Sequence, residues 1–212
     1  MVEWGKRYAA IAAVNGRRYS LPALLLSLAL LALLPVIFGM AELDPAAAAQ
    51  PLEMGAVLIG VVLLAPVCAP ELDSGVRETA DARRTPAVGV CLVRALLGAA
   101  AAAALLAGLV GWMGQNGCQV SALHWFDAFA GALFLGGLGM LSLALAKNQV
   151  VGYMAPLLYY SVSLVSKKGL LGLPSLLAMS RGEPSGAPVL AAAGGGAIAL
   201  ALLVRSRWKA GR

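Results

Sequence analysis

The chain has 212 residues, of which 60% are hydrophobic and only 12% are charged. Soluble domains contain about a quarter charged residues, so this composition excludes an ordinary soluble protein and favours an integral membrane protein. The net charge of +6 does not predict a nucleic-acid partner, because the positive residues flank apolar segments as they do in membrane proteins.

The first residues, 2–16, have the pattern of an amphipathic helix. Trp4, Tyr8 and Ile11 fall on one helical face and Lys6 falls on the opposite side. Such a helix is expected to lie in the cytoplasmic interface of a membrane, with its aromatic rings at the level of the lipid headgroups. The alternative is a tail in which this spacing has no structural consequence.

Six apolar segments follow, each close to the length needed to cross a hydrocarbon core about 30 Å thick. Because a helix satisfies its own backbone hydrogen bonds, they predict an all-α integral membrane protein with one transmembrane domain over residues 1–212. The first segment is longer than the apolar part of a signal peptide, so we interpret it as a retained span. The segments are Tyr19–Ala41, Met54–Pro70, Val88–Gly114, Ala128–Ala146, Val150–Ser166 and Pro188–Val204.

Lysine and arginine set the expected orientation, with both termini in the cytoplasm. We expect the membrane to be the cell membrane of a bacterium. Only Lys167, Lys168 and Arg181 of the 16 basic residues then lie outside. No lysine or arginine occurs in the expected outer loops Glu42–Glu53 and Gln115–Asp127. The 13 basic residues inside are Lys6, Arg7, Arg17, Arg18, Arg77, Arg83, Arg84, Arg94, Lys147, Arg205, Arg207, Lys209 and Arg212.

No charged residue is expected deep within these six segments. Arg94 lies near the cytoplasmic end of the third segment, where its side chain can reach the interface, and Lys147 lies in a turn. Secondary transporters commonly carry ionisable residues at mid-membrane for ion coupling. The sequence therefore indicates that any uphill transport takes its energy from elsewhere.

Two connections are more than turns. Residues 71–86 carry charges of both signs, and Asp73 or Ser74 can cap a cytoplasmic helix before Pro86. Mixed charges can pair along one helical face, and they suit a protein partner better than anionic lipid. Residues 167–187 are too short to span and too apolar for an ordinary loop, which predicts a re-entrant or interfacial element on the outer side.

Motifs for catalysis within the chain are missing. His124 is the only histidine, and the sequence has no G-x-S-x-G motif whose serine it could activate. We therefore interpret His124 as an interfacial residue at the start of the fourth segment. The acidic pairs in residues 71–81 lack further ligands in the third segment to complete a metal site. Cys68, Cys91 and Cys118 form no CxxC, and the sequence contains no G-x-x-x-x-G-K-[ST] for binding ATP.

The order of these features resembles the permease subunits of type-2 ATP-binding-cassette (ABC) exporters. The amphipathic segment Glu3–Asn15 precedes six apolar segments, and "PELDSGVRETADARRTP" is followed by "AVGVCLVRALLGA". In that family a glutamate leaves the second span, a short charged segment follows, and a proline and a basic residue enter the third. The stretch Gly169–Ser180 is similar to the extracellular helices that cap the family's translocation path.

The resemblance implies that two permeases, identical or homologous, form a pathway at their interface. Separate ATPase subunits would bind ATP and Mg²⁺, so this chain would hold no cofactor or metal and would not itself be an enzyme. The surface that couples it to the ATPase would comprise Glu71, Asp73, Arg77, Glu78, Asp81, Arg83 and Arg84.

Candidate pathway residues lie in the fifth segment. Tyr153 and Tyr160 are seven residues apart on one helical face, and Pro156 between them can kink the helix. Tyrosines can contact an amphipathic substrate, but tight helix packing explains the same pattern. Two other functions remain open for the whole chain: a membrane immunity or anchoring protein without turnover, and a lipid-modifying enzyme that depends on a metal.

Overall fold

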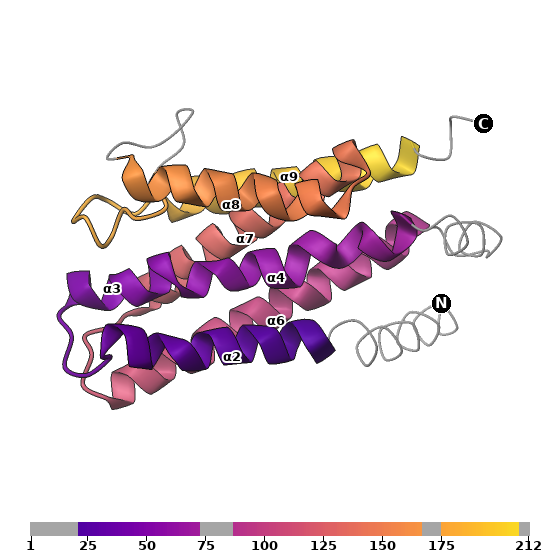
Figure 1. Cartoon of the computed structure of the whole chain (residues 1–212). Coiled ribbons are helices and arrows are strands. Elements are labelled where there is room, and N and C mark those ends of the chain that lie inside the picture. The colour runs from indigo at the N-terminus through magenta and orange to yellow at the C-terminus, as the bar shows by residue number, and fades with distance from the viewer. Residues whose placement is uncertain (1–20, 73–86, 167–174, 208–212) are drawn as a thin grey trace, which may run out of the picture.

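The computed structural model describes residues 21–72, 87–166 and 175–207, and the regular elements in this part of the chain are all helices. They run back and forth along a common axis as a bundle (Figure 1). The predicted all-α class is confirmed for these residues. Five helical stretches are long and apolar enough to cross a membrane, which fits a multi-pass membrane protein: Leu21–Phe38, Pro45–Leu72, Val88–Gln115, Ala122–Ala146 and Ala187–Arg207.

The second of these stretches is built from four consecutive elements, which we call the second helical run. They are α3 (Pro45–Met54), η2 (Ala56–Leu58), α4 (Ile59–Leu64) and η3 (Ala65–Leu72). The remaining elements are α2 (Leu21–Phe38), α6 (Ala87–Gln115), α7 (Ala122–Ala146), α8 (Gln149–Val165) and α9 (Ala187–Arg207).

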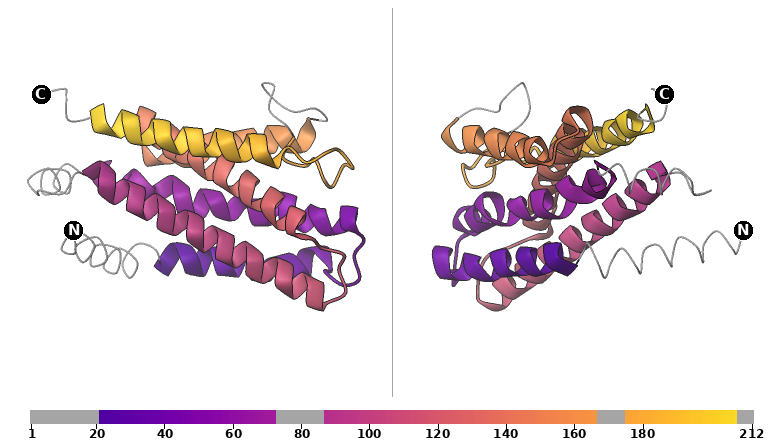
Figure 2. Two further views of the ribbon diagram at one scale, coloured as in Figure 1. Left: turned by 180° about the vertical axis from the view of Figure 1, so that it is seen from behind. Right: turned by 45° about the vertical axis from the view of Figure 1, so that its right-hand side comes forward.

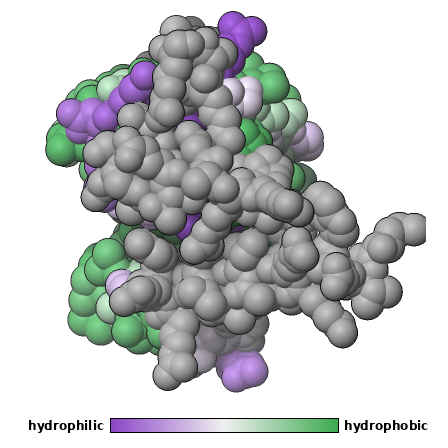
Figure 3. Space-filling view, turned by 90° about the vertical axis from the view of Figure 1, so that its right-hand side faces the viewer, coloured by the Kyte–Doolittle hydropathy of each residue, from purple (hydrophilic) through white to green (hydrophobic). Residues whose placement is uncertain are grey.

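The bundle has two distinct ends. One end, which we call the basic end, contains the start of α2, the end of η3, the start of α6, the turn at Lys147 and the end of α9 (Figures 1 and 2). The opposite end, the loop end, contains the connections 39–44, 116–121 and 175–186. Seen from the basic end, the visible flanks show hydrophobic residues beside hydrophilic ones (Figure 3). Large apolar side chains such as Leu25, Val36 and Leu158 are exposed, as expected for a surface against lipid.

The second helical run begins at Pro45, well before the predicted start at Met54. The Asp44 side chain accepts a hydrogen bond from the Ala47 backbone N–H at 3.3 Å, and Pro45 occupies a first-turn position that suits its fixed φ. The expected outer loop Glu42–Glu53 is therefore wrong, because most of it is helix. Charge at Glu53 suggested a loop, but this side chain is buried within the run.

The fourth helix also begins earlier than predicted, at Ala122 rather than Ala128. Ser121 and His124 form a reciprocal capping box, in which each side chain pairs with the other residue's backbone N–H. The connection expected at Gln115–Asp127 shortens accordingly. His124 and Asp127 thus belong to the first turns of α7, and both are buried.

Of the last two helices, α8 agrees with the predicted Val150–Ser166 to within one residue at each end, whereas α9 extends beyond its prediction. The 17-residue α8 is shorter than the other five stretches and contains Pro156 in its interior. In contrast, α9 continues past the predicted end at Val204 and includes Arg205 and Arg207 in its last turn. Cationic side chains at a helix C-terminus interact favourably with the partial negative charge of its free carbonyl groups.

Glycines let α7 pack closely on two neighbours. A Cβ on Gly60 of α4 would overlap the Ala132 carbonyl oxygen of α7, and one on Gly136 would meet the Gly60 oxygen at 2.6 Å. On another face, a Cβ on Gly137 would meet the Gly194 oxygen of α9 at 2.6 Å. Without these side chains the backbones approach by van der Waals contact, the usual way in which membrane helices associate.

Some predicted elements lie partly or wholly outside the described residues. These are the N-terminal interfacial helix at 2–16, the charged segment after Leu72, and the first part of the element at 167–187. The described remainder of that element, 175–186, is a series of turns. Its Leu176 and Leu177 are buried against the bundle.

Candidate functional site

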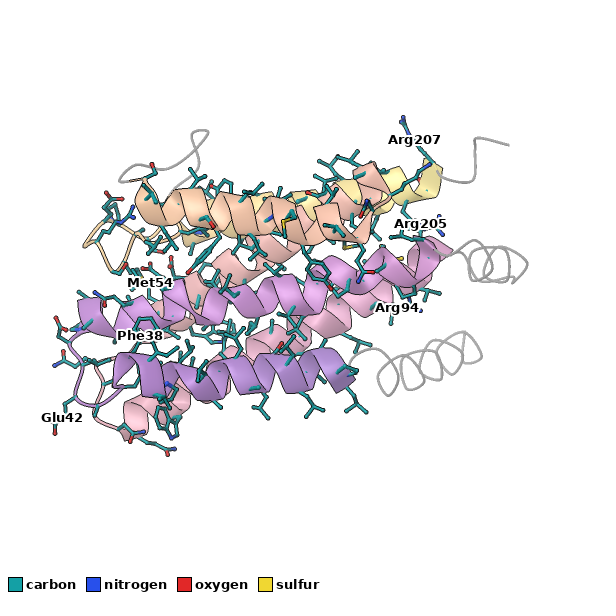
Figure 4. All side chains as sticks on the ribbon, in the orientation of Figure 1. Phe38, Glu42, Met54, Arg94, Arg205 and Arg207 are labelled. Atoms are coloured by element: carbon teal, nitrogen blue, oxygen red, sulfur yellow. The ribbon has the colours of Figure 1, made fainter. Side chains whose placement is uncertain are left out.

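A buried ion pair joins two helices at the basic end. Glu71 lies one residue before the end of η3, and Arg205 lies in the last turn of α9. The Arg205 Nε–H donates to Glu71 Oε2. Arg205 is only 1% exposed and Glu71 only 3%. Figure 4 shows Arg205 between α9 and the end of the second helical run, whereas Arg207 points away. The pair therefore fixes the end of the second run against the last helix.

The other Glu71 oxygen is also satisfied. Cys91 of α6 donates its thiol hydrogen to Glu71 Oε1 over 3.2 Å, and the Cys68 sulfur lies 3.1 Å from the Cys91 sulfur. Arg94, one turn further along α6, donates to the Val67 carbonyl at 3.5 Å. A carboxylate removed from water is costly unless its oxygens find donors, and Glu71 finds one for each. The cluster ties η3 to both α6 and α9.

A second buried carboxylate lies at the loop end of the same helical run. Glu53 is 2% exposed, and its two oxygens accept the backbone N–H groups of Met179 at 2.8 Å and Ser180 at 3.0 Å. Each oxygen therefore has a donor, as a buried carboxyl group requires. Glu53 thus holds the connection 175–186 against the second helical run.

Two further buried residues at the loop end, Asp127 and His124, anchor the start of α7. Asp127 of α7, 4% exposed, accepts the Ser185 hydroxyl hydrogen bond at 2.6 Å. His124 Nδ1 accepts the Ser121 backbone N–H at 3.2 Å, so Nε2 carries the hydrogen and donates to the Pro45 carbonyl at 3.0 Å. These bonds fix the start of α7 against α3 and against the connection before α9.

Arg181 attaches the connection 175–186 to the C-terminal end of α8. Its guanidinium donates to the Ser166 carbonyl at 2.7 Å and to the carbonyls of Ser163 and Leu164 at 3.3 Å. These carbonyls lie at the C-terminal end of α8 and have few helical partners of their own, so a cation stabilises them. The same guanidinium reaches the Ser175 hydroxyl at 3.2 Å.

Of the seven predicted coupling residues, Glu71 belongs to the described range that ends at Leu72, and the other six follow it. Glu71 is described, and its side chain is buried in the cluster with Cys91 and Arg205 and does not lie on the surface. The other six lie outside the described residues, so their part in a coupling surface stays a prediction: Asp73, Arg77, Glu78, Asp81, Arg83 and Arg84.

The candidate pathway residues of α8 face the rest of the chain. Pro156 is buried, and Tyr153 and Tyr160 are partly buried against a cluster that includes Val57 and Leu176. The Tyr160 hydroxyl donates to the Met54 carbonyl. In this conformation both tyrosines serve packing between α8 and the second helical run.

The sequence analysis did not assign roles to Glu53, Asp127, Arg181 and Arg205. The expectation that no charged residue lies deep within the six segments stays a prediction, because Glu53, Asp127 and Arg205 lie just outside those segments. What the sequence did not predict is that these three side chains are buried against other parts of the chain. An isolated acidic residue inside an alanine- and leucine-rich stretch was the available signal, since such residues are rarely buried without a partner. Within the described ranges, no group of three His, Cys, Asp or Glu side chains is arranged to hold a metal.

Comparisons with known proteins add no relative. A scan against protein-family models finds no match, and searches of curated proteins and of solved structures find no significant similarity.

Proposed function

We propose that the chain is the membrane-spanning permease subunit of an ATP-driven exporter of the type-2 ABC class, located in a bacterial cell membrane. The observation that carries the proposal is the attachment of the charged segment 73–86. That segment begins two residues after Glu71, whose side chain is anchored to Arg205 in the core of the basic end. A force applied to the segment by a cytoplasmic partner would therefore act on the bundle rather than on a loose loop.

The proposal includes six membrane spans, with α8 as the fifth. At about 1.5 Å per residue, 17 residues extend roughly 26 Å, slightly less than a typical hydrocarbon core. Short helices are accommodated by local thinning of the bilayer at modest cost. An even number of spans places the start of α2 and the end of α9 on the same side, which the excess of lysine and arginine assigns to the cytoplasm.

The partners of the proposed permease are a separate ATPase, which binds ATP and Mg²⁺, and a second permease chain, identical or homologous. In this proposal the substrate path forms between the two permeases. Tyr153, Pro156 and Tyr160 would contribute to it only if α8 separates from the second helical run, since Tyr160 is bonded to Met54 in the present conformation.

Purification of the chain from its own host in mild detergent tests the proposal. We expect a stoichiometric partner with a P-loop, together with ATPase activity, because the chain itself has no P-loop. The double substitution Arg83→Glu and Arg84→Glu should reduce recovery of this partner or its coupled ATPase activity at least about tenfold, as expected for losing two interfacial charge contacts.

The matched control is Arg207→Glu, which reverses an exposed charge at the same end of the bundle and should leave the partner bound. A chain that purifies alone and without ATPase activity, in wild-type and variants alike, would contradict the proposal and favour an immunity or anchoring protein. Metal-dependent turnover of lipid by the isolated chain would favour an enzyme.

Cysteine accessibility tests the six-span topology. The native Cys68, Cys91 and Cys118 are buried, so they are replaced by alanine and single exposed cysteines are introduced. With a membrane-impermeant maleimide on intact cells, we expect labelling of Glu183→Cys but of Lys147→Cys only after permeabilisation. These positions flank α8, so equal labelling of both on intact cells would show that α8 does not cross the membrane.

A further inference from the structure

The second helical run and the last part of the chain, 175–207, are connected by polar contacts at both ends of the bundle. At the basic end Glu71 pairs with Arg205, the residue two before the end of α9. At the loop end Glu53 accepts the backbone N–H groups of Met179 and Ser180, in the connection before α9. Both acidic residues belong to the second helical run. With a rise of about 1.5 Å per residue in its α-helical parts and about 2.0 Å in the 3-10 helices η2 and η3, they are roughly 32 Å apart.

Between these ends, α7 packs against both the second helical run and α9. Gly60 and Gly194 mark its two contact faces, where backbone lies against backbone. Near the loop end, a shared hydrophobic cluster joins the run to the connection and to the start of α9 through Val57, Leu177 and Leu190. A second cluster packs α2 and α6 against the same run, through residues such as Leu31, Leu106 and Ile59.

We propose that Glu53 and Glu71 are positioning residues that make the second helical run and residues 175–207 move as one unit. A displacement of the run at its basic end is then transmitted through Glu71 and Arg205 to α9, and it shifts the connection 175–186 at the loop end. This inference rests on the proposed function in one respect: the displacement comes from an ATPase that acts on the segment after Leu72.

The physical reason is the stiffness of the connected parts and the strength of the links. Interior packing is dense, so a closely packed helix transmits displacement instead of absorbing it. At the basic end the link is an ion pair, which is stronger than a bond between neutral groups, and at the loop end it consists of two hydrogen bonds to Glu53. The connection 175–186 has no regular secondary structure and is attached by the buried Leu176 and Leu177 and by polar bonds to Glu53, Asp127 and Arg181. It is therefore the part that should respond when either link is weakened.

Amide hydrogen exchange of the purified full-length chain tests the proposal without requiring transport or an ATPase. The reporters are the amides of Met179 and Ser180, which Glu53 protects. In Glu53→Gln we expect the exchange of at least one of them to rise at least about tenfold, because the side-chain amide has a single acceptor oxygen and leaves one of the two N–H groups without its partner. In Glu71→Gln and in Arg205→Gln, changed at the opposite end, we expect a rise of at least about threefold at the same amides.

Two controls separate transmission from general loosening. Arg207→Gln removes an exposed charge from the same turn of α9 and should leave the Met179 and Ser180 amides unchanged. The reference amides are Glu42 and Gln119, which bond across the other loops to the Asn116 and Leu43 carbonyls, at 3.1 and 2.9 Å. Their exchange should not change in Glu71→Gln.

Faster exchange confined to the reporter amides in Glu71→Gln would support transmission. If Glu71→Gln leaves the reporters at the wild-type rate, or accelerates reporters and references equally, the proposal is overturned. Neither result decides whether the chain is a permease, because hydrogen exchange is measured without an ATPase partner. Conversely, a chain without an ATPase partner can still show the transmitted effect.

Discussion

Replacing either member of the Glu71–Arg205 pair by an apolar residue is expected to lower the free energy of unfolding by about 3–5 kcal/mol. The cause is the partner left behind, since a buried guanidinium or carboxylate then loses its counter-charge away from water. The variants are Glu71→Leu and Arg205→Met, measured by reversible unfolding of the purified chain in detergent micelles. Arg207→Met, exposed in the same helix turn, should cause no measurable change.

The double variant Glu71→Leu/Arg205→Met completes a double-mutant cycle and should lose much less stability than the sum of the two single variants. Removing both charges leaves no unpaired ion, and the cost of desolvating the pair disappears with it. Additive losses would show that the two side chains act independently. Cys91 also contacts Glu71, so Cys91→Ala should cost less than either charge removal, because it takes away one weak thiol hydrogen bond.

Gly60→Leu is expected to prevent the wild-type packing of α4 on α7. Even a single Cβ at Gly60 would overlap the Ala132 carbonyl oxygen, which belongs to a helix backbone and cannot rotate away. Overpacking usually costs about 1–3 kcal/mol and more where backbone must move, so we place Gly60→Leu above that range and Gly60→Ala within it. Size-exclusion chromatography and the thermal unfolding midpoint in detergent measure the loss.

Gly108→Ala in α6 is the matched control for Gly60→Ala. A Cβ at Gly108 meets no atom within 4 Å, so the substitution should leave unfolding unchanged or raise the midpoint, because alanine favours helix more than glycine. Equal loss of folded protein in the Gly60 and Gly108 variants would contradict the close packing of α4 on α7.

Much of the helical framework could be predicted from the sequence. Apolar runs such as Val88–Gly114 correspond closely to helices, here α6, because a segment suited to hydrocarbon must satisfy its backbone hydrogen bonds internally. Helix starts were predicted less well. Charged or polar residues at Glu53 and Asp127 suggested loops, but tertiary partners at Met179 and Ser185 satisfy them inside the bundle.

The candidate site was predicted only in part, since Glu71 was singled out for a surface contact and is instead buried. Its partner Arg205 lies 134 residues away, and Met179 lies 126 residues from Glu53. No local pattern of charge or hydropathy specifies such pairings.

The sequence by itself determined the all-α fold class, most of the helical segments and the concentration of basic residues on alternate connections. Each of these follows from local properties: the hydropathy of a segment and the cost of an unpaired backbone group in hydrocarbon. Only the tertiary structure decided which helices meet and which carboxylates are buried. The physical reason is that a buried charge such as Glu71 is tolerated where packing supplies donors from distant parts of the chain, and packing depends on all the helices together.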